Sequence, residues 1–284
     1  MTIAPENPYP RARHERSCTA NFWSGIASVR PDAIHRDIQF GLDRLPFAGH
    51  LPRHRHMNAY ATIVLAGAFE QFSYAGRLKL QPGDVLINPT FDCHSNRMIS
   101  PGTTLIRLPW RYETTFGGVY RNLSIGAIES AAARDAVEAT GLLEEQLIGK
   151  THAPFPVQDC SDKLAIDLGV NPGLRISGWA ERQGVTREYA WRCFIRTFGV
   201  APAQFRSELK ARAALLKIAS SNDPLSRIAA DSGFADQSHM TRAIRLLTGG
   251  SPAQWRGTHL FETNAATSAR SFIRPRHPGR SAGN

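Results

Sequence analysis

Three histidines in the first half of the chain could carry chemistry: His54 and His56, which are separated by one residue, and His94. Three imidazoles can together hold a divalent metal ion. A few polar groups that converge in a pocket are also the usual contacts of a small ligand. Histidines are, however, often structural residues whose hydrogen bonds are satisfied inside the protein. The residue types alone therefore leave a metal site, a ligand pocket and a structural role open.

A second set of polar residues lies in the last third of the chain, on a segment with helical spacing. Its apolar residues recur three and four positions apart and should face a core: Met240, Ala243, Ile244 and Leu247. The residues that should face outward, or lie beside that face, are Gln237, Ser238, His239, Thr241, Arg242 and Arg245. Arginine can pair with guanine and glutamine with adenine, while serine and threonine suit phosphates or bases. We predict that this outward face contacts DNA.

An earlier segment has the same arrangement. Its inward residues are Ala190, Cys193, Phe194 and Phe198, and its outward residues are Arg187, Glu188, Trp191 and Arg192. Thr186 is a suitable N-cap for this helix, and Gly184 can adopt the positive φ that a tight turn before it needs. The outward residues lie where a recognition helix meets base edges, so we predict that they also contact DNA.

The two segments belong to an internal repeat. Residues 199–206 (GVAPAQFR) match residues 249–256 (GGSPAQWR), fifty positions later. Each unit reads as a short helix, a turn that contains glycine, a second helix and a Gly-x-x-Pro exit. A helix, a tight turn and a second helix form the helix-turn-helix motif of DNA-binding proteins. Two copies in register are much harder to attribute to chance than one.

A long helix is predicted between the two units, over residues 202–219. Its expected apolar stripe is Phe205, Leu209, Ala213 and Leu216. A helix of this length spans about 27 Å at ~1.5 Å per residue. It would hold the two recognition helices roughly one turn of DNA (~34 Å) apart, so that both could enter the major groove on one face of the duplex.

With these features, residues 161–260 resemble the DNA-binding domain of the AraC/XylS family of transcriptional regulators. The most specific matches are the segments 233–242 (GFADQSHMTR) and 248–252 (TGGSP). Ala190, Met240 and Ile244 depart from the family pattern, but all three are apolar, so they bear on packing rather than on function. The resemblance implies seven helices, promoter-proximal binding to double-stranded DNA and contact with RNA polymerase.

The region from about 33 to 110 alternates short β-type runs with turn residues. The runs that we expect to be strands lie at 34–40, 59–67, 68–76, 84–89 and 103–110. Their close spacing, without helices between them, predicts an antiparallel sandwich or barrel. The expected fold class is therefore α+β and multidomain, with an N-terminal antiparallel barrel plus helices and a C-terminal all-α domain.

Residues 45–110 resemble a cupin barrel. The segment 83–89 (GDVLINP) and His94 match its second motif, and His54, His56, Tyr60 and Gly67 match its first. In cupin enzymes three histidines and a glutamate bind a metal, but Tyr60 stands at the glutamate position here. We therefore predict no metal, and an effector-binding site at His54, His56, Tyr60 and His94. Arg53, Arg55 and Arg107 could pair with a carboxylate or phosphate of the effector.

The segment 126–150 is rich in Ala, Glu and Leu and should form one or two helices. Its apolar residues include Leu142, Leu143, Leu147 and Ile148. In the family this position supplies dimer contacts, so the resemblance implies a homodimer interface. The alternative is that these side chains simply pack on the barrel.

Composition and charge fit this organisation. Residues 1–171 contain 17 Lys and Arg and 17 Asp and Glu, whereas residues 172–261 contain 13 and 6, a net charge of +7. This basic excess indicates a polyanionic partner for the C-terminal part. The predicted organisation is a flexible arm (1–20), a sensor and dimerisation domain (21–150), a linker (151–160), a DNA-binding domain (161–262) and a disordered basic tail (263–284).

No apolar run approaches the ~18 residues of a membrane span, and the start of the chain lacks the apolar core of a secretory signal. The four cysteines, Cys18, Cys93, Cys160 and Cys193, form no zinc or disulfide pattern. These features predict a cytoplasmic protein that does not bind a membrane.

The sequence thus predicts a transcription regulator that responds to a small-molecule effector, with no catalytic residues and no cofactor. Two alternatives remain open. The N-terminal half could be only a dimerisation module, or the chain could join a metal-dependent cupin enzyme to a DNA-binding domain. The sequence does not decide between activation and repression.

Overall fold

The structure is a computed structural model that describes residues 38–112, 117–154, 157 and 159–256. The arm predicted at 1–20 and the basic tail predicted at 263–284 lie outside the described residues. None of the described helices is long and apolar enough to cross a membrane.

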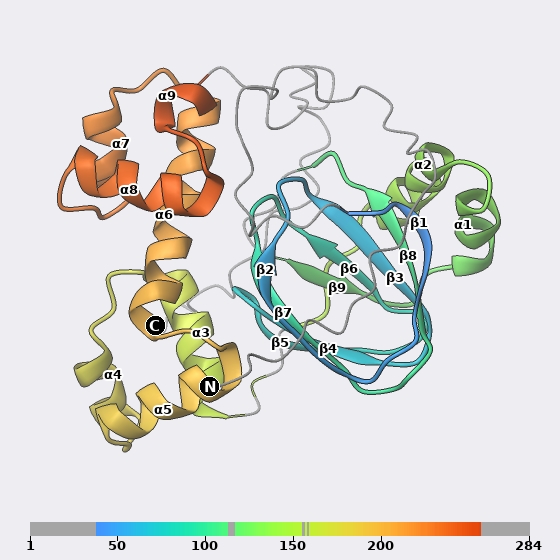
Figure 1. The fold of residues 1–284 in the computed structure, drawn as a ribbon, viewed down its shortest axis with the longest axis horizontal. Coiled ribbons are helices and arrows are strands. Elements are labelled where there is room, and N and C mark those ends of the chain that lie inside the picture. The colour runs from blue at the N-terminus through green and yellow to red at the C-terminus, as the bar shows by residue number, and fades with distance from the viewer. Residues whose placement is uncertain (1–37, 113–116, 155–156, 158, 257–284) are drawn as a thin grey trace, which may run out of the picture.

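The described part of the N-terminal half forms a barrel of two antiparallel sheets that face each other (Figure 1). One sheet has the strand order β1-β8-β3-β6-β9 and the other has the order β2-β7-β4-β5. The strands are β1 (Gly41–Leu45), β2 (Gly49–Arg55), β3 (Tyr60–Ala66), β4 (Phe69–Ser73), β5 (Gly76–Leu80), β6 (Val85–Asn88), β7 (Cys93–Met98), β8 (Thr103–Pro109) and β9 (Gly118–Tyr120). The predicted antiparallel architecture is confirmed.

Apolar side chains from both sheets pack together inside the barrel. Val64, Leu86 and Leu105 of the five-stranded sheet meet Phe69 and Leu80 of the four-stranded sheet. This alternation of inward apolar residues is the pattern from which β3, β4, β6 and β8 were predicted. The prediction of a strand at 34–40 is wrong for residues 38–40, which are not in a strand. Strand β1 begins only at Gly41.

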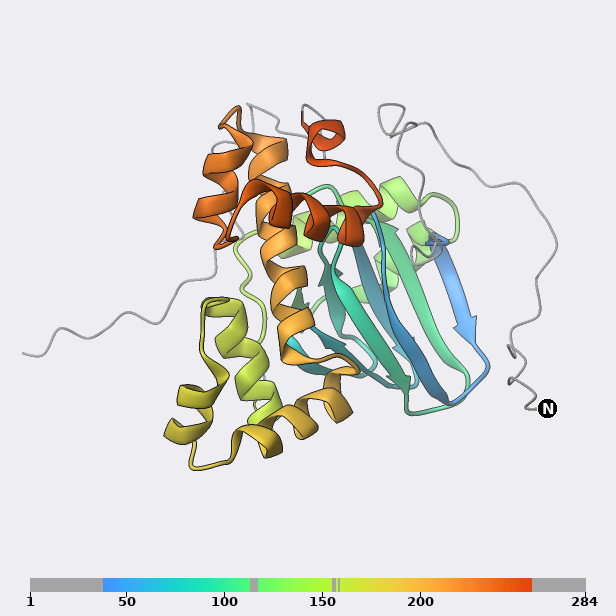
Figure 2. The same ribbon diagram turned by 60° about the vertical axis from the view of Figure 1, so that its left-hand side comes forward.

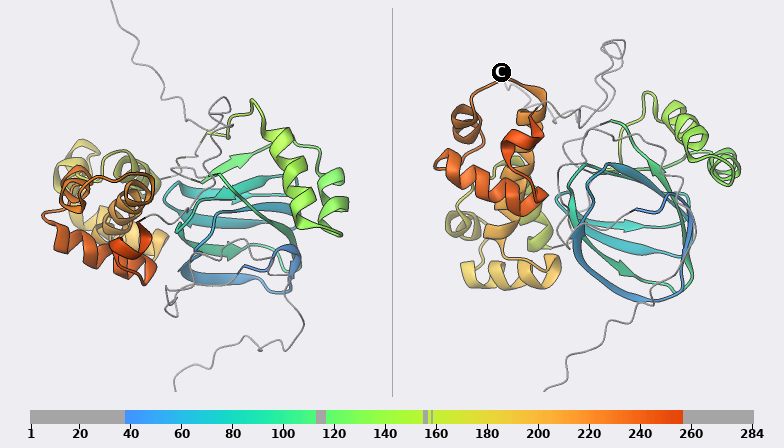
Figure 3. Two further views of the ribbon diagram at one scale, coloured as in Figure 1. Left: turned by 90° about the horizontal axis from the view of Figure 1, so that it is seen from above. Right: turned by 45° about the horizontal axis from the view of Figure 1, so that its top comes forward.

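Two helices, α1 (Ile125–Ala132) and α2 (Ala136–Leu147), cover the five-stranded sheet on the side away from the C-terminal helices (Figures 1 and 3). Leu143 and Leu147 are buried in a cluster with Ile106 and Leu108 of β8. These two leucines pack on the barrel, so they cannot supply the contacts expected of a dimer interface. Ile148 remains exposed.

Seven helices lie within residues 159–256, the number that the family resemblance implies. They are α3 (Cys160–Val170), α4 (Ile176–Arg182), α5 (Arg187–Phe198), α6 (Pro202–Ser220), α7 (Leu225–Asp231), α8 (Gln237–Thr248) and α9 (Pro252–Trp255). The long helix α6 runs through the centre, with α3, α4 and α5 around one end and α7, α8 and α9 around the other (Figures 1 and 2).

The apolar stripe predicted on α6 is only partly correct. Phe205 and Leu209 are buried, but Ala213 is exposed and Leu216 is only half-buried. The buried positions further along the helix include Leu215 and Ile218. The difference arises because α6 is covered by both helix-turn-helix units and by the barrel, so its buried surface is wider than one stripe.

The barrel and the C-terminal helices share a continuous apolar core. Phe72 of β4 packs edge-on against Phe198, with ring centroids 6.4 Å apart. The rings of Tyr74 and Phe205 are 5.3 Å apart in the same way. This surface lies on the four-stranded sheet, opposite α1 and α2 (Figure 3).

Candidate nucleic-acid interface and histidine pocket

The first helix-turn-helix unit consists of α4, a turn and α5. Gly184 in the turn has φ +66°, which confirms the positive φ expected there. The Thr186 side chain accepts a hydrogen bond from the backbone N–H of Tyr189 at 3.1 Å, so it is the N-cap of α5. The apolar side of α5 is buried at Ala190, Phe194 and Phe198, and Cys193 is half-buried. All four predicted contact residues are exposed: Arg187, Glu188, Trp191 and Arg192.

The second unit, α7, a turn and α8, repeats this geometry. Gly233 has φ +74° in the turn, and Asp236 caps α8 by accepting a hydrogen bond from the N–H of His239 at 2.7 Å. The four predicted core residues, Met240, Ala243, Ile244 and Leu247, are all buried. Of the predicted contact residues, Gln237, Ser238, His239, Arg242 and Arg245 are exposed, and Thr241 is half-buried.

The two second helices, α5 and α8, lie near opposite ends of α6 (Figure 2). With 19 residues, α6 is about 28 Å long at ~1.5 Å per residue. Each of the two helices presents arginine and other polar side chains on the face that the helical core leaves open. Such a pair of helices can insert into two segments of a major groove and donate hydrogen bonds to base edges.

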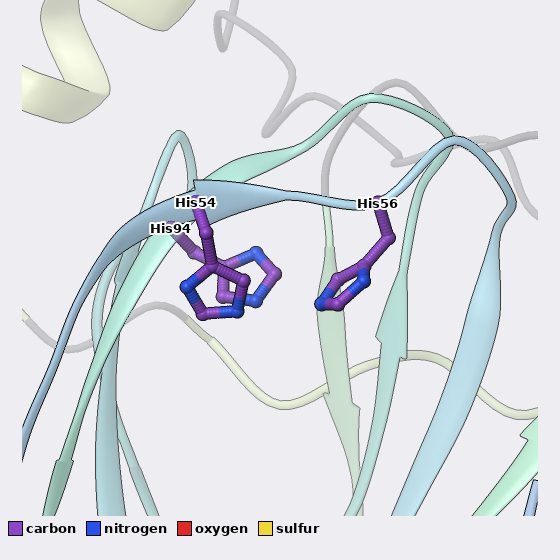
Figure 4. Close-up of side chains that lie close together, drawn as sticks. All are labelled: His54, His56 and His94. Carbon is purple, nitrogen blue, oxygen red and sulfur yellow. The ribbon is translucent and has the colours of Figure 1, made fainter. Parts of the chain in front are cut away.

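The three histidines come together at one end of the barrel (Figure 4). His54 on β2 and His94 on β7 are paired residues of neighbouring strands, and their ring centroids are 4.5 Å apart. The His56 ring lies 5.0 Å from His54 and 5.4 Å from His94. His94 is fully buried, and His54 and His56 are 8% and 9% exposed. The predicted convergence of His54, His56, Tyr60 and His94 is what the structure shows.

Hydrogen bonds fix the proton positions on two of these rings. His54 Nδ1 lies 2.8 Å from the Pro52 carbonyl oxygen, and His94 Nδ1 lies 3.1 Å from the Asp92 carbonyl oxygen. A carbonyl can only accept, so both Nδ1 atoms carry the proton and both Nε2 atoms are left as acceptors when the rings are neutral. The Tyr60 hydroxyl lies 3.3 Å from His94 Nε2 and can donate to it. Burial raises the pKa of Tyr60, so its phenol keeps this proton.

A cavity of about 300 Å³ opens beside this cluster. One part of its wall is apolar and includes Phe47, Leu51, Phe69, Met98 and Leu105. The other part is polar and includes His54, His56, Tyr60, Thr62, Gln71, Asn96 and Arg107. No sequence motif points to Thr62, Gln71 and Asn96, because single inward polar residues on a strand have no spacing signal of their own. A mixed wall of this kind suits a small organic ligand with an apolar body and hydrogen-bonding groups.

The three histidines are also the group that could hold a metal ion, because one nitrogen from each lies within 4.8 Å of the others. The Nδ1–H bonds to backbone carbonyls are an arrangement common among metal-binding histidines. Tyr60, however, stands at the position of the carboxylate ligand, and its phenol is neutral where a carboxylate would carry a negative charge. The residues present therefore fit hydrogen bonding to a ligand better than they fit a metal that needs an anionic fourth ligand.

Two of the arginines expected to bind an effector face away from the cavity. Arg53 forms an ion pair with Glu208 of α6 at 2.7 Å, and Arg55 donates to the backbone carbonyl of Leu246 in α8 at 2.6 Å. The alternation of β2 explains this difference, because His54 and His56 point inward and the residues beside them must point outward. Arg107 does line the cavity, but it forms an ion pair with Asp43.

Comparisons with known proteins agree with the second half of this description. A family described as "Helix-turn-helix domain" matches residues 179–258. No curated protein sequence matches the chain.

Among solved structures, ToxT from Vibrio cholerae strain SCE256 bound to an unsaturated fatty acid is 9% identical, with a TM-score of 0.35, covering 79% of this chain and 96% of ToxT. The C-terminal domain of AraT, a response regulator from Geobacillus stearothermophilus, is 20% identical, with a TM-score of 0.33, covering 35% of this chain and 84% of that one. An AraC-type transcriptional regulator from Chromobacterium violaceum is 21% identical, with a TM-score of 0.29, covering 32% and 80%.

Proposed function

We propose that this chain is a DNA-binding transcription regulator, because residues 179–258 match a helix-turn-helix family, and that it responds to a small organic effector bound in the barrel. The observation that carries the proposal is the histidine pocket, where three imidazoles and a phenol converge beside a cavity of about 300 Å³. A ligand there would form hydrogen bonds with the imidazoles and the phenol. Its apolar part would lie against Phe69, Met98 and Leu105.

We further propose that α5 and α8 are the recognition helices. The contact residues would be Arg187, Glu188, Trp191 and Arg192 on α5, and Gln237, Ser238, His239, Thr241, Arg242 and Arg245 on α8. Their exposure and the net charge of +7 over residues 172–261 (13 basic and 6 acidic residues) support this assignment. Contact with RNA polymerase and the formation of a homodimer stay predictions. Of the four residues expected at the dimer interface, Leu142 and Ile148 are not fully buried.

Replacing His56 and His94 together by alanine should abolish effector binding and leave DNA binding within a few-fold. The reason is that the two imidazoles lie in the barrel rather than on the outward faces of α5 and α8, so the loss of an effector contact removes the allosteric shift rather than the DNA affinity itself. We would screen small organic molecules and divalent metal ions by thermal shift, because a ligand that binds only the folded protein raises its melting temperature. Each stabilising compound would then be tested on the double variant.

His50→Ala is the matched control, because His50 lies on β2, the strand that ends just before His56, and is exposed. It should keep the full stabilisation. If the His56→Ala, His94→Ala variant folds and is still stabilised as much as the wild type, the effector binds elsewhere. Stabilisation by metal ions alone would favour the metal-dependent alternative, and the absence of any stabilising compound would favour the dimerisation module.

A further inference from the structure

Strand β2 has two faces that serve different parts of the molecule. His54 points into the barrel, as does His56 just beyond the end of the strand, while Arg53 and Arg55 point out toward the C-terminal helices. Figure 1 shows β2 on the side of the barrel that faces α6. Adjacent side chains of a strand lie on opposite faces, so any displacement of the histidines moves the two arginines with them.

Arg55 forms a hydrogen bond at the C-terminal end of α8, the second proposed recognition helix. The last carbonyls of a helix have no partner within it, and a positive charge is stabilising there. In α8 the N–H of Gly250, which would otherwise bond to the Leu246 carbonyl, donates instead to the Thr248 hydroxyl at 3.1 Å. Arg55 supplies the missing donor to Leu246 at 2.6 Å, and it is 8% exposed.

Arg53 forms an ion pair with the long helix α6. Its ion pair with Glu208 is shielded, with side-chain exposures of 11% and 14%. The guanidinium also lies 5.5 Å from the centre of the Phe205 ring and 5.6 Å from that of Tyr74. The Tyr74 hydroxyl adds a hydrogen bond to the same Glu208 carboxylate at 3.3 Å.

The segment that carries His94 likewise contacts both the other histidines and the C-terminal helices. His94 bonds to the carbonyl of Asp92, and the neighbouring Thr90 carbonyl accepts a hydrogen bond from Arg212 of α6 at 2.7 Å. Phe91, between them, donates its N–H to the His56 carbonyl at 3.0 Å and packs edge-on against Trp255 of α9, at 5.4 Å. Both histidine-bearing segments thus form the wall between the cavity and the DNA-binding helices.

We propose that this wall regulates DNA binding, with Arg53 and Arg55 as positioning residues that carry the state of the histidine pocket to α6 and α8. This inference rests on the proposed effector site. The contact residues of α5 and α8 stay largely exposed while the domains are docked, so docking does not cover the DNA-binding face. It fixes the placement of α8 relative to α5, and a shift of β2 would change how well both helices fit one DNA site.

The test uses the full-length protein and a filled cavity in place of the unidentified effector. Thr62→Phe adds a ring to the cavity from β3, which lies in the opposite sheet, so that no residue of β2 is itself replaced. The probe is a DNA duplex selected from a random-sequence library by the wild-type protein. Thr62→Phe should change the dissociation constant by at least about fivefold, the lower end of common allosteric couplings. In an Arg55→Ala background the same substitution should change it by less than about twofold.

Arg97→Ala is the matched control, because Arg97 on β7 pairs with Glu70 of the barrel rather than with the helices. In this background the effect of Thr62→Phe should be retained. Leu105→Phe, which fills the cavity from β8, provides a second filling substitution if Thr62→Phe does not fold. In hydrogen exchange, filling the cavity should raise the exchange rate of residues 237–250 only when Arg55 is present.

Equal effects of cavity filling with and without Arg55, or no effect of either filling substitution on DNA affinity, would overturn the proposal. Neither result depends on a ligand. The coupling through Arg55 can therefore be disproved while the thermal-shift experiment still supports the effector pocket. Conversely, the thermal-shift experiment can find no ligand while the comparison of Thr62→Phe with and without Arg55 still shows coupling.

Discussion

The DNA association constant of the full-length protein should fall on the order of a thousandfold between about 50 and 200 mM salt. Each phosphate that a Lys or Arg neutralises releases condensed counterions, and this release becomes less favourable as salt rises. The excess of basic residues over 172–261 and the exposed arginines Arg187, Arg192, Arg242 and Arg245 supply the charges. Fluorescence anisotropy with a labelled duplex at a series of salt concentrations measures the slope.

Two variants show which charges contribute. Lys217→Ala on α6 should leave the slope unchanged, because the Lys217 ammonium donates to the Asp231 carbonyl of α7. Arg245→Ala, at a proposed DNA contact, should reduce the slope by about one if the guanidinium neutralises a phosphate. An affinity that does not depend on salt would contradict the assignment of this surface to DNA.

Trp255→Ala should destabilise the protein by about 3–5 kcal/mol, the usual cost of truncating a fully buried tryptophan. Trp255 is 0% exposed. Its indole N–H donates to the Thr248 hydroxyl at 2.8 Å, and its ring packs on Phe91 of the barrel wall. The substitution therefore removes packing from α9 and from the domain interface together. Urea unfolding followed by circular dichroism measures the change.

Trp191→Ala is the matched control for this experiment. Trp191 is 46% exposed on the outward face of α5, so its truncation should change the unfolding free energy by no more than about 0.5 kcal/mol. It should instead weaken DNA binding. If the two tryptophan variants unfold at the same denaturant concentration, the packing assigned to Trp255 is wrong.

The DNA-binding half could be predicted closely from the sequence because its signals are local. Glycine, proline and capping residues recur at fixed offsets, and the apolar residues of α5 and α8 follow the helical period. The stripe on α6 was less predictable. Which side of a helix is buried depends on every element that packs against it, and Leu215 and Ile218 are buried although Ala213 is not.

The barrel shows the opposite situation. Strands β2 and β7 were not predicted, although they carry His54 and His94, because polar residues at inward positions hide the alternation that marks a strand. The histidines could still be placed together by the resemblance to a cupin barrel. No such guide existed for Arg53 and Arg55, since their partners, Glu208 and Leu246, are more than 150 positions away along the chain.

The base preferences of two single variants show whether two recognition helices read one DNA site. Arg192→Ala on α5 and Arg242→Ala on α8 should each weaken binding to the preferred duplex by about 1–3 kcal/mol and relax the preference at one base position. The matched control is Lys217→Ala, which should leave the preference profile unchanged.

Selection from a random-sequence library followed by sequencing gives the preference profile of each full-length variant. The two relaxed positions should differ and lie about 10 base pairs apart, one turn of the double helix. Relaxation at the same position in both variants, or an equal loss of affinity for every sequence, would contradict this expectation.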